Sequence, residues 1–292
     1  MKVVYKLKNN NMETGIIKTQ EEILSIGNIK LNLNLYNPNK KIKSILIFTH
    51  GYGEHSGYYD DFATFFAKKG VFCVSYDLRS HGLSEGKRGH VSDFELFIDD
   101  LQNVINYSKG VVKNKDVYLF GHSLGGSIVL NFLLRRDANE IKKGIVSSPW
   151  LKLAFEPPKS KLIMARIGKA LFPSFVMKGE LNIDHLSRNS DFKKRFEQDP
   201  LTYDLISPGY YFEIYDAGIW ALNNADKLRT PVLMSHGDDD KVTSMNASKE
   251  FCEKAGKFCL FKNWENGYRH VVFSENDKDM IFDYFYSYLV QE

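Results

Sequence analysis

The sequence has 292 residues, 43% of them hydrophobic and 26% charged, which is enough for one large globular core. The formal net charge is only +3, and the short basic run Asn39–Lys43 is too small for a nucleic-acid surface, so we predict no nucleic-acid partner. No stretch approaches the ~20 apolar residues of a membrane span. Met1–Thr14 lacks the apolar region of a secretory signal.

The three cysteines are Cys73, Cys252 and Cys259. This odd, low count predicts no disulfide framework, and no pair has the spacing of zinc ligands. Cys73 lies in an apolar run and is interpreted as a small core residue. Together with the missing span and signal, the cysteine usage favours a soluble, cytoplasmic protein whose only membrane association would be peripheral.

Short apolar runs bounded by Gly, Asp or Ser are the predicted strands: Ile29–Tyr36, Ser44–Phe48, Val71–Tyr76, Asp116–Phe120, Gly144–Ser147, Val232–Ser235 and Lys257–Phe261. The middle five are nearly continuous apolar segments, the pattern of a parallel sheet that is covered on both faces. Ile29–Tyr36 instead alternates Leu with polar residues, which predicts an antiparallel strand near an edge of the sheet.

Amphipathic stretches between and after these runs are the predicted helices: Tyr59–Lys69, Phe94–Tyr107, Leu124–Arg136 and Lys278–Val290. Strands and helices alternate along the chain. The predicted fold class is therefore α/β, with a mostly parallel central sheet and helices on both of its faces.

The alternation breaks between Trp150 and about Asn224, a region with no good strand and five of the eight prolines. We predict that 150–224 form an inserted helical cap on a core made of 1–149 and 225–292. Within the cap, Lys159–Lys169 has apolar residues on one face, including Leu162, Ile163 and Ile167. This face could contact a membrane or micelle, or could simply pack on the core.

The segment Gly121–Gly126, GHSLGG, follows one predicted strand and precedes a predicted helix. It contains G-x-S-x-G, with Ser123 between Gly121 and Gly125. A nucleophile elbow needs this order of strand, sharp turn and helix, since the turn exposes the serine above the sheet. Ser123 is therefore the candidate nucleophile.

A serine nucleophile needs an imidazole base, and the base needs a carboxylate that fixes its tautomer. In hydrolases with such an elbow, the chain order is Ser, then Asp or Glu, then His. Of the histidines after Ser123, only His270 follows a plausible carboxylate loop, HGDDDKV. That loop also predicts a cation site as an alternative, although no recognised metal-binding loop is present. Spacing alone does not decide which of the three aspartates, Asp238 to Asp240, turns inward.

Several motifs spread over Lys43–Ser287 resemble the monoacylglycerol lipase and lysophospholipase family of α/β-hydrolases. They are HGYGEHSGYY, YDLRSHGLSEGKRGHV, GHSLGG, HGDDDKV, the cap segments LSRN and DPL, and His270 with Glu275. The resemblance implies an α/β-hydrolase fold with a lipid ester as substrate and no metal or other cofactor. It also implies that Asp240 is the orienting carboxylate, and that the N–H groups of Tyr52 and Leu124 form the oxyanion hole.

The candidate substrate-binding residues are Glu54, Tyr58, His122 and Phe196. Two of them depart from the family pattern, which often has arginine at the position of Tyr58 and tyrosine at that of Phe196. Ser80 also replaces a usual glycine. The change at Ser80 concerns the shape of its loop, and Phe196 lacks a hydroxyl near the polar end of the substrate. Together these differences leave the preference for a glycerol head group open.

The predicted function is a serine hydrolase that cleaves lipid esters, as a monoacylglycerol lipase or lysophospholipase, through an acyl-enzyme on Ser123. The alternatives are a carboxylesterase for small esters and a peptidase of the same fold. A binding module without catalytic activity would leave Ser123 unlabelled by a fluorophosphonate, and the complete set of predicted catalytic residues argues against it.

Overall fold

The computed structural model describes residues 7–9 and 15–291. In this part of the chain nine strands form one sheet: in spatial order β1 (Leu7–Asn9), β2 (Ile16–Leu24), β3 (Lys30–Pro38), β5 (Val71–Tyr76), β4 (Ser44–Thr49), β6 (Asp116–His122), β7 (Ile141–Ser147), β10 (Val232–Gly237) and β11 (Cys259–Trp264). The pairs from β5 to β11 are parallel, whereas β1, β2 and β3 pair antiparallel. The predicted mostly parallel sheet is confirmed.

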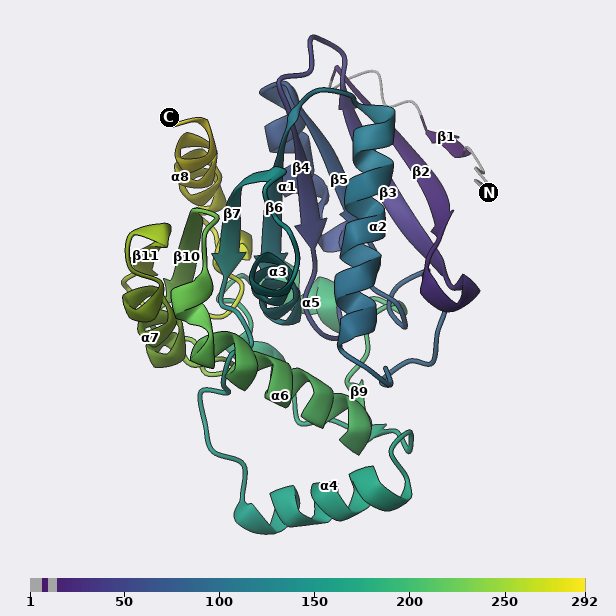
Figure 1. The fold of residues 1–292 in the computed structure, drawn as a ribbon, viewed down its shortest axis with the longest axis vertical. Coiled ribbons are helices and arrows are strands. Elements are labelled where there is room, and N and C mark those ends of the chain that lie inside the picture. Colours follow the sequence, from purple (N-terminus) through teal and green to yellow (C-terminus); the bar gives the residue numbers. More distant parts are fainter. Residues whose placement is uncertain (1–6, 10–14, 292) are drawn as a thin grey trace.

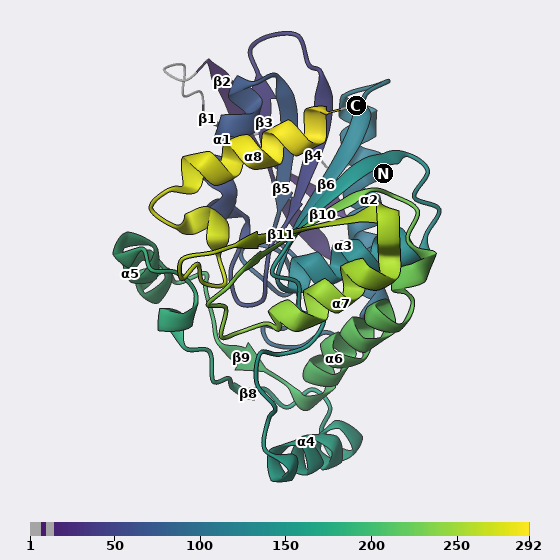
Figure 2. The same cartoon turned by 90° about the vertical axis from the view of Figure 1, so that its left-hand side faces the viewer.

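Helices cover both faces of the sheet, because successive side chains of a strand point to opposite sides. In β4, Ile45 and Ile47 belong to the buried cluster of α2 (Glu95–Val111), α3 (Leu124–Arg135) and α7 (Met245–Ala255). Leu46 and Phe48 belong to the cluster of α1 (Asp60–Lys68) and α8 (Lys278–Val290). Figures 1 and 2 show α2 and α3 on one face and α1 and α8 on the other.

The antiparallel end of the sheet differs from the sequence prediction. β3 is antiparallel as predicted, but it lies inside the sheet, since β2 and β1 extend the edge beyond it. The sequence of β2, IIKTQEEIL, has no regular alternation of apolar and polar residues, and its burial is equally irregular. The hydrophobic pattern therefore gave no signal for this strand.

The segment between β7 and β10 contains α4 (Lys159–Leu171), β8 (Met177–Lys178), α5 (Ser190–Gln198), β9 (Leu205–Ile206) and α6 (Pro208–Asn223). α6 packs on α3, and its residues Tyr210, Ile214 and Ala217 join the main buried cluster. α4 packs on α6 and lies at the end of the molecule that the parallel strands point toward (Figure 1). No helix within the described residues is long and apolar enough to cross a membrane.

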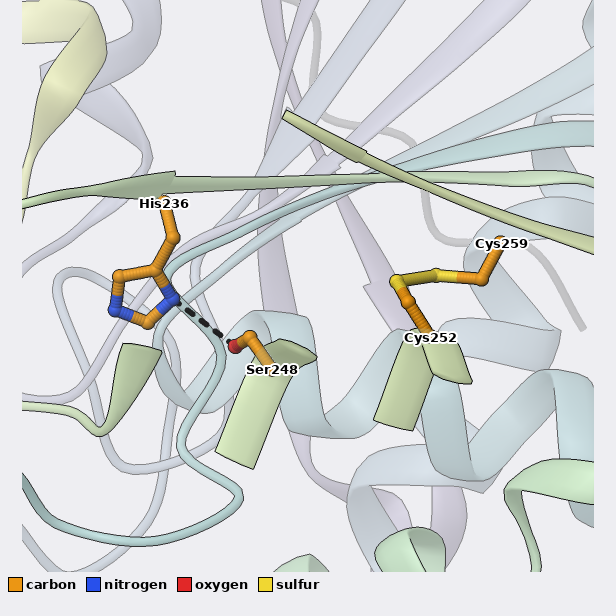
Figure 3. Close-up of a disulfide and its surroundings, with 4 residues drawn as sticks. All are labelled: His236, Ser248, Cys252 and Cys259. Atoms are coloured by element: carbon orange, nitrogen blue, oxygen red, sulfur yellow. Dashed lines mark hydrogen bonds between the residues drawn. A yellow bond between two sulfur atoms is a disulfide. The ribbon is translucent and has the colours of Figure 1, made fainter. Parts of the chain in front are cut away.

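The prediction of no disulfide is wrong. Cys252 near the end of α7 and Cys259 at the start of β11 form a disulfide, with their Cα atoms 4.8 Å apart (Figure 3). The chain reverses between them through the short 3-10 turn Gly256–Phe258, which brings together two residues whose spacing gave no such sign. The cysteine usage therefore no longer supports the prediction of a cytoplasmic location. Cys73 is a buried free cysteine, as predicted.

Candidate active site

Ser123 lies at the junction of β6 and α3. Its backbone angles, φ 52° and ψ −116°, are strained for a residue with a side chain. The turn is held by the Ser123 N–H, which donates to Ser147 O at 3.0 Å, and by the Trp150 N–H, which donates to Ser123 O at 2.9 Å. A Cβ atom on Gly125 would lie 2.1 Å from Thr49 O, so only glycine lets α3 start this close to β4. The structure thus has the strand–turn–helix geometry of an elbow, with Ser123 lining a cavity.

Two backbone N–H groups near Ser123 are free to bind an anion. In the described part of the chain, neither the Tyr52 nor the Leu124 N–H donates a hydrogen bond to another group. Leu124 is the first residue of α3, where N–H groups have no partner within the helix. Tyr52 belongs to the loop after β4, which touches Ser123: a Cβ atom on Gly51 would lie 3.1 Å from Ser123 Cβ.

Glu54 and His50 fix the loop after β4 from within. Glu54 Oε1 accepts the Gly51 N–H at 2.5 Å and the Tyr59 hydroxyl at 2.7 Å, and burial raises the pKa of Glu54. His50 Nδ1 lies 2.7 Å from Gly51 O, and its Nε2 accepts the Leu78 N–H at 2.9 Å. Burial lowers the pKa of His50 to about 3, so this ring is neutral and orders the loop.

Asp240 and His270 come together from different loops. Asp240 follows β10 and His270 follows β11, and Asp240 Oδ2 lies 2.8 Å from His270 Nδ1. Both side chains are almost completely buried. Asp240 Oδ1 also accepts the N–H groups of Val242, at 2.7 Å, and Thr243, at 3.0 Å. Burial alone would raise the pKa of Asp240, but His270 and His236 hold it well below its usual range, so it is a carboxylate.

The other two aspartates of this loop do not face His270. Asp238 accepts the N–H groups of Asn266, at 3.0 Å, and Gly267, at 2.9 Å, and so ties the loop before His270 to the end of β10. Asp239 pairs with Lys241 at 2.6 Å on the surface. Of the three aspartates, Asp240 is therefore the one that faces His270, which their spacing in the sequence could not decide.

The sequence reasoning missed His236 as a partner of Asp240. It lies at the end of β10, and its Nε2 is 2.9 Å from the same Oδ2 atom that faces His270. Its Nδ1 lies 3.0 Å from Ser248 Oγ on α7 (Figure 3). The sequence does show a histidine four residues before Asp240. The chain order of nucleophile, carboxylate and base excludes His236 as the base, but it does not exclude His236 as a partner of the carboxylate.

His122 lies directly beside His270. The two ring centroids are 4.7 Å apart, and His122 Nδ1 is 3.1 Å from Ser147 O. Burial and the nearby His270 lower the pKa of His122 well below its usual value, so the ring is neutral. It lines the cavity together with Ser123 and therefore forms part of the cavity wall beside the candidate nucleophile.

The loop after β4 is also attached to α5 and the chain that follows it. His55 Nε2 lies 2.9 Å from Asp199 Oδ2, and Tyr58 OH lies 3.4 Å from the same oxygen. The Tyr58 ring packs on Phe196, and Tyr58 does not line the cavity, whereas Phe196 and Glu54 do. Tyr58 therefore packs against α5 in this structure and does not line the cavity.

The cavity has a volume of about 570 Å³ and lies between the sheet edge and the segment from β7 to β10. The core side contributes the polar groups already described. The opposite side is mostly apolar, with Trp150, Leu153, Leu162, Phe172, Phe175 and Ile206 among its residues. One end can therefore react with a carbonyl group, and the rest suits an apolar chain.

A family profile described as "Serine aminopeptidase, S33" matches residues 40–277. An abhydrolase domain-containing protein of Dictyostelium discoideum is 30% identical over 87% of this chain, which spans only 27% of that relative. The monoacylglycerol lipase of Mycolicibacterium smegmatis is 23% identical, with 94% of this chain and 97% of that protein covered.

Solved structures agree with the profile. The crystal structure of Paleococcus ferrophilus monoacylglycerol lipase superposes with a TM-score of 0.77 and 27% identity, covering 86% of this chain and 97% of that one. The profile spans most of the chain, and the sheet, elbow and loop positions are those expected of the fold. The chain therefore belongs to the serine aminopeptidase S33 family of α/β-hydrolases, and the predicted resemblance to monoacylglycerol lipases is confirmed.

Proposed function

We propose that the protein cleaves carboxylic esters of lipids, with Ser123 as nucleophile, His270 as general base and Asp240 as the residue that orients His270. The chain is a serine ester hydrolase by family and relatives. The observation that carries the lipid assignment is the cavity of about 570 Å³, which is apolar over most of its wall and has Ser123 and His270 on its core side. A monoacylglycerol or a lysophospholipid has the matching shape, with one ester between a polar head and one apolar chain.

In the proposed reaction, Ser123 Oγ attacks the ester carbonyl carbon and its proton passes to His270. Asp240 holds the Nδ1–H of His270, which keeps the other ring nitrogen free for this proton and stabilises the imidazolium. The N–H groups of Tyr52 and Leu124 stabilise the oxyanion. His270 then gives the proton to the leaving alcohol. Water, deprotonated by His270, hydrolyses the acyl-enzyme and restores Ser123.

We propose residues 150–224 as the cap that supplies the acyl pocket. Several of its residues line the cavity, including Leu162, Phe172 and Phe175. α6 forms its base, because α6 packs into the main buried cluster. α4 is its outer part, joined to the rest mainly through α6.

The outer face of α4 is the proposed site of contact with a lipid surface. Ile163 and Ile167 are more than half exposed, at 60% and 55%. Met164 and Phe172 are exposed and also line the cavity, so the apolar surface continues from the outside into the pocket. Such a face suits insertion among lipids, where an acyl chain could enter without crossing water. A cytoplasmic location stays a prediction.

A hydrolysis panel tests the proposed function: monoacylglycerols of varied chain length, lysophosphatidylcholine, short p-nitrophenyl esters and aminoacyl amides, with Ser123→Ala as the control. We expect the lipid esters to be cleaved, and the amides at least about 100-fold more slowly. The cavity wall is mostly apolar, and of the carboxylates that line it, Glu54 and Asp204 already accept hydrogen bonds from the protein, while Glu180 is a further acidic residue in the lining. A fluorophosphonate should label the wild type and not Ser123→Ala. Full esterase activity in a folded Ser123→Ala protein would refute the scheme, and a preference for amides would favour the peptidase alternative.

A further inference from the structure

The carboxylate of Asp240 is shared by two imidazole rings. Its Oδ2 atom accepts from His270 Nδ1 at 2.8 Å and lies 2.9 Å from both His236 Nε2 and Thr243 Oγ1. Its Oδ1 atom is held separately by two backbone N–H groups. The side chains of His236 and Asp240 are fully buried, so water does not replace any of these donors.

The surroundings of His236 fix its tautomer. Nε2 faces two acceptors, Asp240 Oδ2 at 2.9 Å and Thr243 O at 3.3 Å, so this nitrogen carries the proton. Nδ1 lies 3.0 Å from Ser248 Oγ, whose hydroxyl can donate to it (Figure 3). Ser248 lies in α7 and is fully buried, so the helix sets the orientation of the ring.

We propose that His236, held by Ser248, is a positioning residue of the active site whose Nε2–H binds the same carboxylate oxygen that orients His270. This inference rests on the proposed roles of Asp240 and His270. Oδ1 is anchored by the Val242 and Thr243 N–H groups, so the carboxylate keeps its place when His236 is lost. The negative charge on Oδ2 is then shared by fewer donors, and its bond to His270 strengthens. His270 would consequently hold a proton up to a higher pH.

A test of this proposal must leave the contacts of the other ionisable groups near His270 unchanged. Glu54 from the loop after β4, His122 from β6, His185 from the cap and Lys241 from the loop after β10 all line the cavity with His270. None of them has a hydrogen bond to His236 in the described part of the chain. Substitution of His236 therefore acts on His270 through Asp240 and through Thr243, whose carbonyl oxygen lies 3.3 Å from His236 Nε2 and whose Oγ1 lies 3.3 Å from His270 Nδ1.

The experiment measures kcat/KM for a soluble p-nitrophenyl ester from pH 5 to pH 10 in His236→Phe, His236→Gln and Ser248→Ala. The acidic limb of this profile reports the base of the free enzyme. Phe fills the space without a donor, and we expect it to move the limb up by about one pH unit. At pH 7 kcat/KM should fall by about threefold to tenfold, and at pH 9 it should recover to within about threefold of wild type.

Gln keeps a donor and an acceptor at this place, so His236→Gln should restore the limb to within about 0.3 pH units of wild type. Ser248→Ala should produce a smaller shift than Phe in the same direction. An unmoved limb in folded His236→Phe, or a Gln variant as impaired as Phe at every pH, would overturn the inference. If His236→Phe does not fold, an unchanged profile in Ser248→Ala overturns it instead. Failure of the proposed function would show in the wild type, as absent ester hydrolysis or absent labelling of Ser123.

Discussion

The loops at the carboxyl edge of the sheet and the helix α4 of the proposed cap are built in opposite ways. Around Ser123 and Asp240, side chains are buried, and backbone groups approach so closely that a single Cβ atom would collide. α4 instead exposes apolar side chains such as Ile163, and its packing is mainly against α6. If the proposed function holds, the chemistry and the delivery of substrate depend on separate parts of the molecule. Substitutions in the first part should abolish turnover of every ester, and substitutions in the second should change only how a lipid arrives.

Gly125→Ala should have the largest effect among substitutions in the loops around Ser123. The new Cβ atom would lie 2.1 Å from Thr49 O and 2.5 Å from His50 O, both backbone atoms of a central strand and its loop. We expect the free energy of unfolding to drop by about 3 kcal/mol or more and ester hydrolysis to be lost. Gly144→Ala in β7 is the control, because its nearest neighbour would be 3.4 Å away, and it should cost at most about 1 kcal/mol. Urea denaturation and the p-nitrophenyl assay measure both effects. A Gly125→Ala protein as stable and active as Gly144→Ala would contradict the elbow geometry.

Asp240→Asn tests the same region without a steric change. Asparagine keeps the shape but cannot hold the His270 tautomer or stabilise its cation, so kcat/KM should fall by about 10³- to 10⁴-fold. Asp239→Asn is a matched control one residue away. The Asp239 side chain pairs with the surface residue Lys241, so this variant should stay within about twofold of wild type. Circular dichroism should show both proteins folded. Equal activities of the two variants would mean that the orienting carboxylate is assigned to the wrong aspartate.

Substitutions on α4 test the other half of the contrast. Ile163 and Ile167 are exposed and do not line the cavity, so a double change to Glu should not alter the reaction itself. We expect about tenfold slower hydrolysis of monoacylglycerol presented in phosphatidylcholine vesicles, because two apolar side chains no longer enter the lipid. Uncharged vesicles exclude simple repulsion between the new charges and the surface. Hydrolysis of a soluble p-nitrophenyl ester should be unchanged.

Met280→Glu is the control for an added surface charge. Met280 is 52% exposed and belongs to α8. Figure 1 shows α8 in the upper part of the molecule and α4 at the bottom. This variant should retain vesicle activity. If Met280→Glu loses as much vesicle activity as the α4 variant, an added surface charge anywhere on the protein causes the loss. If the α4 variant loses no vesicle activity, the proposed contact surface lies elsewhere.

Features that depend on the local sequence could be predicted, whereas features that depend on distant parts of the chain could not. The central strands and the elbow at Ser123 are specified locally, by apolar runs and by glycines that backbone contacts require, and the structure has them as predicted. The disulfide between Cys252 and Cys259 depends on a chain reversal, and the irregular β2 edge strand depends on its neighbours, so neither left a readable pattern.

The contact of His236 shows a different limit of prediction from the sequence. Its identity and spacing from Asp240 were visible in the sequence, but the contact depends on how the loop after β10 folds back over the strand end. Likewise Tyr58 was expected near the substrate and instead packs beneath α5 on Phe196. Side-chain direction in loops is set by tertiary packing, which one sequence alone does not encode in any local pattern.

The smallest predicted effect concerns Glu54, which belongs to the loop after β4 and lines the cavity. Burial raises its pKa, so the folded protein binds a proton more tightly than the unfolded chain, in which a glutamate has a pKa of about 4.3. Stability therefore decreases as the pH rises from about 4.3 through the folded pKa. Glu54→Gln keeps an oxygen that can accept from Gly51 and Tyr59 but has no charge to bury. The variant should be nearly as stable as wild type at pH 5 and should gain relative to it, by up to about 1 kcal/mol, toward pH 8.

Glu275→Gln is the matched control for a buried carboxylate that has a cationic partner. Glu275 accepts from Arg188 Nε at 3.0 Å, and that arginine is 36% exposed, so water compensates part of the loss. Replacing this carboxylate should cost about 1–3 kcal/mol at pH 8, the opposite sign to Glu54→Gln. Urea midpoints of the three proteins at pH 5 and pH 8 measure the difference. If Glu54→Gln destabilises the protein at pH 8 as Glu275→Gln does, then the charge of Glu54 holds the loop after β4, and its role is electrostatic and not that of a neutral brace.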